Sequence, residues 1–470
     1  MRTGRRRIAF YLFPVIAALA PLPAHAQLRV VAETLRRTPE GPSVVYKRFI
    51  GLPAVGDGAG NQVTFVARVK GTLVSPVGVY AEDGDPTDTG GGSTIAKKDQ
   101  TSPTAANFTK FNEPSINASG RVTFPSLLRA EGRGVFLDGV TSVALRLDDA
   151  PTPAGTAFFE AFLASRITDG GDVVFRASLG NAPVVLGLEI DQGIYRCSGG
   201  ASPNCSSQEG GSSTLTPLVL RGDLVGGRTV CSIGEYSASS YGIAFRATTQ
   251  LDCLDTLEAP IDGIFRRAFG GGVETLALVG GASAPDPMNT TYGGVARPPA
   301  ITNDGTVAFW SSITGVGAAG LFVCDPATCP VPSMPTLVAQ EGTADASDQP
   351  PNNDLIRFSA PAISDAGDVA FHATLVGASG RLKGIFVYRQ GTGLIETVAL
   401  KDGVAPKVDA GDPDALFRRF VAPPRMSAGG RITFQATVRR VLGSPRMRRA
   451  VYVSGSPSAA FLDVASDALS

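Results

Sequence analysis

Histidine is the side chain that most often acts as a catalytic base, and this sequence contains two. Of the two histidines, His25 lies in an N-terminal segment that we predict is removed, so a Ser-His-Asp triad would depend on His372. His372 follows a phenylalanine that recurs along the chain. The residues at the same place in other copies are Arg176, Arg246, Trp310 and Gln435. We therefore interpret His372 as a position of a repeated element, and the sequence identifies no catalytic residue.

Two acidic loops carry oxygen ligands that could hold calcium. Their carboxylates are Asp83, Asp85 and Asp88 in the first loop, and Asp409, Asp412 and Asp414 in the second. Neither spacing fits the twelve-residue calcium loop, so we interpret both as acidic turns. We expect no metal site and no cofactor, with a structural calcium ion as the alternative. Carboxylates are abundant, so a glycosidase-type pair stays open.

A stretch of small and polar residues, Pro361–Phe371, recurs along the chain with slight variations. It is typical of a strand end, a tight turn around Gly367 and a new strand, because Ser364 can bond the turn backbone and glycine supplies a left-handed conformation. The copies lie about 62 residues apart on average, which indicates a propeller or a solenoid. Their final residues are Phe65, Phe124, Phe175, Phe245, Phe309, Phe371 and Phe434.

Each unit continues with two more strands of a regular kind. After the signature strand comes a Gly-apolar-aromatic strand, such as Gly384–Phe386, and then a fourth apolar strand, such as Glu396–Leu400. With 56 Gly, 34 Pro and 7% aromatic residues, the composition suits short strands joined by turns. Four strands in each of seven units predict an all-β fold, a seven-bladed β-propeller. A solenoid repeat is usually shorter and less rich in loops.

An extra copy of the fourth strand lies near each end of the propeller. The N-terminal copy is Arg29–Leu35 and the C-terminal copy is Ala460–Val464. We predict that the N-terminal copy pairs into the last blade and closes the ring, displacing or extending the C-terminal copy.

The repeat alignment chooses among the fifteen possible pairings of the six cysteines. Residues 197 and 324 end third strands, and residues 205 and 329 lie in the turns that follow. We therefore predict the disulfides Cys197–Cys205 and Cys324–Cys329, and the remaining pair gives Cys231–Cys253. The spacings do not fit a zinc site, which usually has Cys pairs two to four residues apart.

The N-terminus has the features of a signal peptide. Residues 1–26 combine Arg5, Arg6 and Arg7 with an apolar run and an Ala-His-Ala cleavage site ending at Ala26. We predict export to the periplasm or the extracellular space, and a single propeller domain over residues 27–470. The 42 basic and 42 acidic residues give no electrostatic footprint for nucleic acid. No later segment is apolar enough to span a membrane, and we expect a monomer.

The signature resembles known repeats. Pro361–Phe371 is similar to the P-x-x-S-x-D-G-x-x-I-A-F repeat of TolB-like propellers. Asn117–Phe124 resembles still more the N-x-x-G-x-x-A-F signature of exported bacterial tandem-repeat proteins. The resemblance covers nearly the whole mature chain and implies a propeller, but it implies no activity, because the repeated residues form turns and cores.

These observations favour an exported, non-enzymatic binding or scaffold module whose partner is an unknown protein or glycan. Recognition would use the variable loops Asp83–Thr101, Cys197–Ser213 and Thr343–Asp354. The alternative is an extracytoplasmic polysaccharide hydrolase or lyase, with carboxylate, Tyr or Arg side chains converging at the channel mouth. A cluster of such side chains at one mouth would favour the enzyme.

Overall fold

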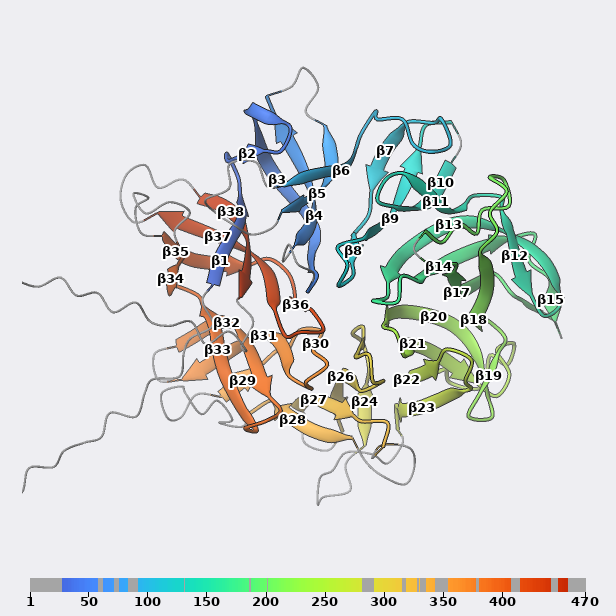
Figure 1. Ribbon diagram of the computed structural model, residues 1–470. Helices are drawn as coiled ribbons and strands as arrows, with labels where there is room; N and C mark the ends of the chain where they lie inside the picture. The colour runs from blue at the N-terminus through green and yellow to red at the C-terminus, as the bar shows by residue number, and fades with distance from the viewer. Residues whose placement is uncertain are drawn as a thin grey trace, which may run out of the picture.

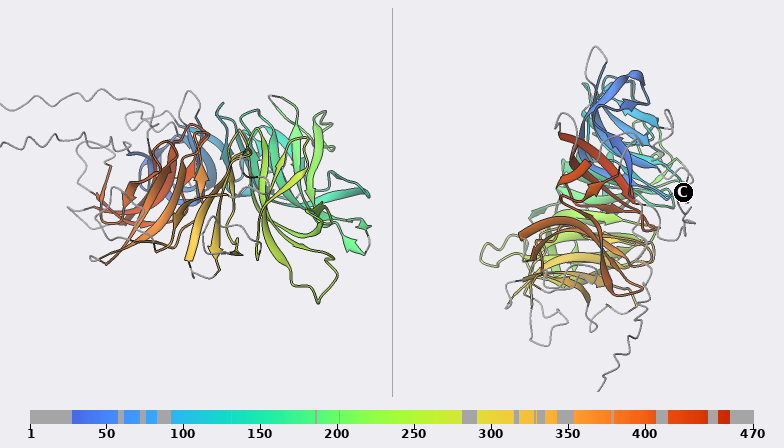
Figure 2. Two further views of the ribbon diagram at one scale, coloured as in Figure 1. Left: turned by 90° about the horizontal axis from the view of Figure 1, so that it is seen from below. Right: turned by 90° about the vertical axis from the view of Figure 1, so that its left-hand side faces the viewer.

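The chain folds into a closed ring of seven antiparallel β-sheets around a central channel (Figure 1). The structure is a computed structural model. It describes residues 28–454 except 58–61, 72–75, 83–91, 131, 186, 201, 281–290, 315–317, 328, 330–334, 343–353, 378–379, 407–414 and 441–446. Every regular element in these residues is a strand. The predicted seven-bladed β-propeller is confirmed. Seen from the side, the ring is a thick disc whose strands cross its thickness (Figure 2).

Each blade has four main strands, and we number the blades in chain order from blade 1 at Phe65 to blade 7 at Phe434. The first strand of each blade, in one or two pieces, lies innermost. These strands are β3 (Gly41–Val55), β7 (Phe108–Phe111), β8 (Ser115–Ile116), β13 (Gly155–Ile167), β20 (Arg228–Ala238), β24 (Tyr292–Gly294), β25 (Ala300–Ile301), β29 (Asp354–Ile356), β30 (Ala362–Ile363), β35 (Ala415–Phe420) and β36 (Arg425–Met426).

The second and third strands form the middle of each blade. The second strands, which carry the signature phenylalanines, are β4 (Val63–Lys70), β9 (Val122–Leu128), β14 (Val173–Gly180), β21 (Gly242–Gln250), β26 (Val307–Ile313), β31 (Val369–Gly377) and β37 (Ile432–Arg440). The third strands are β5 (Val77–Glu82), β10 (Gly132–Leu137), β17 (Gln192–Ser198), β22 (Ile261–Ala268), β27 (Ala318–Cys324), β32 (Gly380–Arg389) and β38 (Met447–Ser454).

The outer strands complete the blades. They are β6 (Ser93–Lys97), β11 (Thr141–Leu145), β18 (Thr214–Leu220), β23 (Val273–Leu278), β28 (Thr336–Gln340), β33 (Leu394–Leu400) and, in blade 7, β1 (Leu28–Glu33). Four blades contain an additional short strand that pairs with their first strand. These short strands are β2 (Arg37–Thr38), β12 (Asp149–Thr152), β19 (Leu224–Val225) and β34 (Val404–Ala405). A separate hairpin joins β15 (Val184–Val185) and β16 (Leu188–Glu189).

The signature turn has the geometry that its residues predict. In blade 6, Gly367 has φ 81°, a left-handed conformation that glycine adopts at little cost. The backbone N–H of Gly367 donates to the Ser364 carbonyl oxygen at 2.9 Å, and the N–H of Asp368 donates to the Ser364 hydroxyl at 3.2 Å. The serine side chain therefore replaces a backbone partner in the turn.

A pair of stacked aromatic rings lies in the core of every blade. Each signature phenylalanine pairs in register with the aromatic residue of the third strand, and the ring centroids are 5.4–6.3 Å apart. The pairs are Phe65–Tyr80, Phe124–Phe136, Phe175–Tyr195, Phe245–Phe265, Phe309–Phe322, Phe371–Phe386 and Phe434–Tyr452. All of these side chains are buried. Because each blade has one such pair in its core, the signature phenylalanine recurs once per blade.

The N-terminal strand closes the ring, as the sequence predicts. β1 pairs antiparallel with β38 from Leu28 opposite Ser454 to Glu33 opposite Ala450. Val30 and Ala32 are each 2% exposed, so the strand is packed into blade 7. The proposed C-terminal copy, Ala460–Val464, lies outside the described residues.

Three disulfides join the cysteines in the pairs that the repeat alignment predicts: Cys197–Cys205, Cys231–Cys253 and Cys324–Cys329. By the loop-entropy relation, loops this short stabilise the fold by roughly 2–3 kcal/mol each. The described part of the chain contains no helix with the length and apolar character that a membrane crossing requires.

Candidate ligand site at the mouth of the central channel

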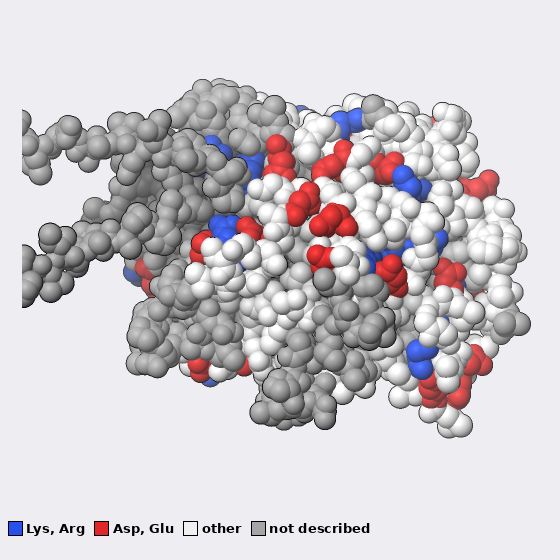
Figure 3. Space-filling view, turned by 60° about the horizontal axis from the view of Figure 1, so that its bottom comes forward, with Lys and Arg blue, Asp and Glu red and all other residues white. Residues whose placement is uncertain are grey.

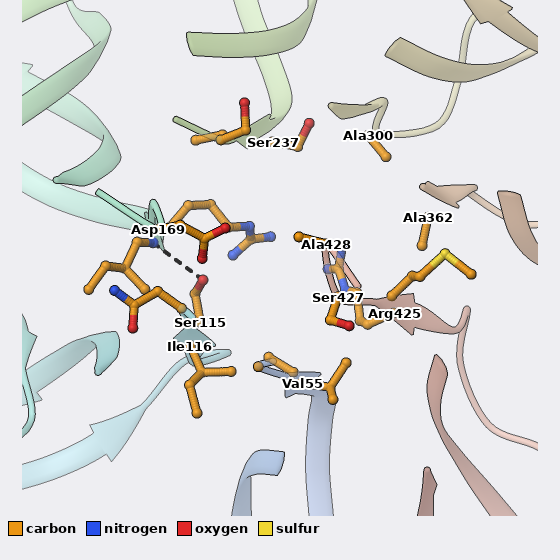
Figure 4. Close-up of a pocket in the computed structure, with 18 of the residues that line it drawn as sticks. Val55, Ser115, Ile116, Asp169, Ser237, Ala300, Ala362, Arg425, Ser427 and Ala428 are labelled. Atoms are coloured by element: carbon orange, nitrogen blue, oxygen red, sulfur yellow. Dashed lines mark hydrogen bonds between the residues drawn. The ribbon is translucent and has the colours of Figure 1, made fainter. Parts of the chain in front are cut away.

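The seven signature turns converge on one cavity of about 180 Å³ at a mouth of the central channel. Every blade contributes lining residues, from Leu52–Asp57 in blade 1 to Arg425–Ala428 in blade 7. In Figure 4, Asp169 and Ser115 lie on one side of this cavity, and Arg425 and Ser427 lie on the other. The first strands deliver these residues because each of them ends at the mouth, where its turn leads into the second strand.

Hydrogen bonds between neighbouring turns build the rim of the cavity. At the junction of blades 2 and 3, Asp169 Oδ1 accepts from the Ala118 N–H at 2.8 Å. Between blades 3 and 4, the Ser240 hydroxyl accepts from the Gly170 N–H at 3.2 Å. The Ser240 N–H in turn donates to Asn303 Oδ1 of blade 5 at 3.0 Å. A side chain at the start of one turn thus binds the backbone of the turn beside it.

The same arrangement continues around the rim to blade 1. Asp365 Oδ1 accepts from the Asn303 N–H at 2.8 Å, and the Asp365 N–H donates to the Ala428 carbonyl oxygen at 2.9 Å. Asp57 Oδ2 then accepts from the Gly429 N–H at 2.6 Å, and Asp57 Oδ1 accepts from the Ser427 hydroxyl. The amide of Asn303 donates to both Asp169 Oδ2 and Asp365 Oδ2 at 2.8 Å, which links blades 3, 5 and 6.

Blades 1 and 2 meet at the rim through close backbone contact. A Cβ added to Gly56 would lie 2.6 Å from the Asn117 carbonyl oxygen, a distance that no side chain could occupy. Glycine is therefore required here for the turns to approach each other. The backbone of the rim is held on all sides by its neighbours, so the side chains it carries are preorganised.

One position of each blade faces the cavity just below the rim. We call it the channel position. It is the first-strand residue that pairs, across the β-ladder, with the second-strand residue just before the signature phenylalanine. It is small in five blades and arginine in blades 3 and 7. The seven residues are Ala54, Ser115, Arg166, Ser237, Ala300, Ala362 and Arg425.

The two channel arginines make few hydrogen bonds. The Arg425 guanidinium forms an ion pair with Glu113, with Nη2 3.6 Å from Oε2, but it donates no hydrogen bond to any residue that the structure describes. Arg166 donates through Nη1 to the Ser165 carbonyl oxygen at 2.8 Å. Its guanidinium also lies 6.0 Å from the centroid of the Tyr236 ring. Each guanidinium has five N–H donors, so most of these donors have no partner among the residues that the structure describes.

Burial and the neighbouring charge of Arg166 disfavour the positive charge of Arg425. Desolvation inside the channel, followed by the repulsion of Arg166, lowers the pKa of Arg425 to about 10, although Glu113 acts in the opposite direction. Arg425 is still charged at neutral pH, and a bound anion would relieve the repulsion between the two guanidiniums.

The rim of the cavity is acidic, in contrast to the channel positions. On the face shown in Figure 3, acidic side chains gather near the middle and basic side chains lie to either side of them. The rim itself contributes three carboxylates, those of Asp57, Asp169 and Asp365. The cavity therefore combines a ring of hydrogen-bond acceptors with a pair of cationic donors below it.

The acidic loops and the variable loops singled out from the sequence contribute no described residue to the cavity. Both acidic loops, 83–88 and 409–414, fall outside the described residues, as do residues 83–91 and 343–353 of two variable loops. In the third variable loop, the Cys205 N–H donates to the Val143 carbonyl oxygen at 3.0 Å, so this loop packs on blade 2. None of the described loop residues lines the cavity. Among the described residues, no group of three or more His, Cys, Asp or Glu side chains is arranged to hold a metal ion.

His372 occupies the repeated position that the sequence indicates, between blades 6 and 7. Its ring centroid is 6.1 Å from that of Phe420, and its Nε2 is buried without a hydrogen-bond partner among the described residues. Burial, followed by the charges of Lys383 and Arg297, lowers the pKa of His372 to about 4. It does not line the cavity.

The lowered pKa makes His372 a source of acid sensitivity. An unfolded histidine takes up a proton near pH 6.5, whereas the folded chain resists this until about pH 4, so stability falls as the pH decreases through this interval. We expect His372→Gln, which copies Gln435 of blade 7, to remove up to about 3 kcal/mol of this loss. Urea unfolding of both proteins between pH 7 and pH 4 measures the difference. Parallel pH profiles would contradict the prediction.

Sequence reasoning missed the arginine pair. It interpreted Pro361–Phe371 as a strand end, a tight turn and a new strand, and it directed attention to the variable loops, whereas the signature segments themselves form the mouth. The available signal was that Arg166 and Arg425 stand where the other aligned signatures have serine or alanine, as in Ser115 and Ala362.

Comparisons with known proteins identify a family and distant neighbours. A family of unknown function (DUF7453) matches residues 18–140 and 331–470, more than half of the chain. No curated protein matches the sequence.

Among solved structures, an oligogalacturonate lyase in complex with manganese is 11% identical, with a TM-score of 0.42, over 93% of this chain and 99% of its own. The polysaccharide lyase Uly1 is 11% identical, with a TM-score of 0.38, over 92% and 98%. The β-propeller domain of the Trilobed protease from Pyrococcus furiosus is 10% identical, with a TM-score of 0.30, over 75% and 96%. These likenesses are too distant to assign an activity to this chain.

Proposed function

The chain belongs to the DUF7453 family, whose function is unknown, and we propose that it is an exported, non-enzymatic binding module. Its channel mouth holds a carboxylate or a similar anionic group of a ligand between Arg166 and Arg425. The observation that carries this proposal is the presence in one cavity of two guanidiniums whose donors mostly have no partner among the described residues.

The available hydrogen-bond donors of the two arginines support anion binding. The described lining holds four carboxylates: Glu113 forms an ion pair with Arg425 at 3.6 Å, whereas Asp57, Asp169 and Asp365 belong to the rim. Asp57, Asp169 and Asp365 are held at the rim by hydrogen bonds from the turns. Planar guanidiniums bind carboxylates through paired hydrogen bonds, and such bonds are stronger than those between neutral groups.

The other groups of the cavity support binding over catalysis. None of the described residues that line it is a His, Lys, Tyr or Cys, so the proton-transfer groups and nucleophiles that it offers are carboxylates and hydroxyls. The cluster of acid, Arg and Tyr side chains that would favour the alternative hydrolase or lyase is incomplete, because the described lining offers acid and Arg without Tyr. The Tyr236 hydroxyl is engaged elsewhere, donating to the Val174 carbonyl oxygen at 2.8 Å.

Export is part of the proposal. Residues 1–26 have the pattern of a signal peptide, and the three disulfides are typical of an oxidising compartment. The ligand is therefore expected among the carboxylates available to an exported protein.

The arginine pair can be tested with simple anions. We expect the mature protein to bind one equivalent of propionate or sulfate in calorimetric titrations at constant ionic strength. Arg166→Met and Arg425→Met keep an unbranched side chain but remove the charge-assisted hydrogen bonds, so each should weaken binding by about tenfold or more.

Arg68→Met is the matched control, because Arg68 is exposed on β4 and lies outside the cavity. We expect it to bind as the unchanged protein does. Absence of anion binding, or equal binding by all three variants, would rule out the proposed function.

A further inference from the structure

The cavity has two chemical layers, and a simple anion would use only one of them. The guanidiniums of Arg166 and Arg425 occupy channel positions, whereas Asp57, Asp169 and Asp365 belong to the rim turns that follow the channel positions along the chain. A ligand that fills the cavity must therefore offer an anionic group to the channel and hydrogen-bond donors to the rim.

The rim carboxylates still have acceptor capacity. Each of Asp57, Asp169 and Asp365 accepts two hydrogen bonds from the turns. A carboxylate offers about four acceptor positions, so each retains about two for a ligand. The existing bonds hold these groups in place, which lowers the entropy lost on binding.

A buried serine hydroxyl is separate evidence for a polar ligand in the channel. Ser237 occupies the channel position of blade 4, and its Oγ is buried without a hydrogen-bond partner among the described residues. An unsatisfied buried hydroxyl costs free energy, so such groups usually have a partner. A ligand hydroxyl in the cavity would supply one once the Ser237 side chain rotates to another rotamer, because protein atoms enclose the Oγ in this structure.

The distribution of these groups restricts the ligand. The rim acceptors come from blades 1, 3 and 6, and the Ser237 hydroxyl comes from blade 4, so polar groups surround the cavity. A polyanion would bring further negative charges against the three carboxylates. A single ammonium group would satisfy one side only. A ring with hydroxyl groups around its edge matches the whole arrangement.

The cavity size fits one such ring. Its volume is about 180 Å³. A cavity of roughly 150 Å³ can hold benzene, whereas drug-sized ligands need about 300–1,000 Å³. One six-membered sugar ring is therefore a better match than an oligosaccharide bound along its length.

We propose that the anion held by Arg166 and Arg425 is the carboxylate of a sugar acid, whose hydroxyl groups bind the acidic rim and Ser237. This inference rests on the proposed function and names its ligand class. The sugar acid is either free or the end of a glycan chain, since both present the same carboxylate and hydroxyl groups.

The test compares four probes by calorimetric titration of the mature protein: D-glucuronate, D-glucose, propionate and L-alanine. We expect D-glucuronate to bind about tenfold or more tightly than propionate, because additional hydrogen bonds to charged groups are formed. We expect no measurable binding of D-glucose. A disaccharide that links D-glucuronate to a neutral sugar distinguishes the sources: binding as tight as that of the free acid indicates a chain end, and weaker binding indicates a free sugar acid.

Variants separate this inference from the proposed function. Ser237→Ala removes a hydroxyl that has no partner among the described residues, so folding should be unaffected, while D-glucuronate binding should weaken several-fold. Asp57→Asn should bring the affinity for D-glucuronate closer to that for propionate, with thermal melting as the check on folding. Ser237→Ala should leave the affinity for propionate within about twofold, because it changes neither the arginines nor any charge in the cavity.

Equal binding of propionate and D-glucuronate would overturn the sugar-acid inference and leave the proposed function standing. Tighter binding of L-alanine than of D-glucuronate would overturn it in favour of a zwitterion site. Failure of every carboxylate to bind would overturn both proposals.

Discussion

Removal of residues 27–33 is expected to destabilise the ring by about 5 kcal/mol, a large part of the 5–15 kcal/mol that stabilises typical domains. These residues include β1, the outer strand of blade 7, in which Val30, Val31 and Ala32 are buried. Burial of a valine side chain contributes about 1.5–3 kcal/mol. The ion pair between Glu33 and Arg448, at 3.1 Å, would also be lost. Urea unfolding and size-exclusion chromatography measure the result.

The shortened protein should also associate, because β38 would become an unpaired strand edge. A peptide of residues 27–36, added in excess, should restore part of the stability by pairing with that edge. Val404→Ala serves as the control, since Val404 is 70% exposed on β34 of the same blade. A shortened protein with unchanged stability would show that β1 does not close the ring.

Phe175→Ala is expected to cost about 3–5 kcal/mol, and more than the same change at Phe245. The Phe175 ring contacts Phe159, Phe162 and Tyr195, with centroids 5.3, 5.6 and 5.9 Å away. Among the described residues, Phe245 has one aromatic ring partner, Phe265, at 5.4 Å. Aromatic pairs contribute about 0.5–1.5 kcal/mol each beyond their buried area, so the difference should be about 1–3 kcal/mol.

The comparison between the two phenylalanines is the informative measurement, because both are fully buried and start from the same side chain. Urea midpoints of the two alanine variants, with Phe175→Leu as a milder change that retains apolar volume, give the ranking. A larger loss at Phe245 would mean that cavity relaxation outweighs the aromatic contacts in these blades.

The architecture was predictable because it depends on residues that recur. The signature phenylalanines fill equivalent places in every blade, so their spacing reveals the number of units. The extra strand at Arg29–Leu35 repeats the pattern of an outer strand, which makes its pairing with the last blade predictable. The cysteine pairs follow from the same alignment, since Cys197 and Cys324 end equivalent third strands.

The candidate site was not predictable in the same way, because it arises where seven segments that are distant in the sequence meet. Arg166 and Arg425 are separated by hundreds of residues, and only closure of the ring brings them to one cavity. In a strand, adjacent side chains point to opposite sides, and the sequence does not say which side faces a channel. His372 and Arg176 show the same ambiguity, since their side chains lie between blades.

The separate roles of rim and channel positions have a consequence for how the protein can diversify. Hydrogen bonds among the turns hold the rim, whereas the channel positions of most blades carry only Ala or Ser. Exchanging Ala54, Ala300 or Ala362 for a larger or charged residue would alter the cavity without removing any bond that maintains the ring. Seven sites of this kind form a combinatorial set, so related propellers could acquire new selectivities one blade at a time, and the same sites are the natural starting point for redesign.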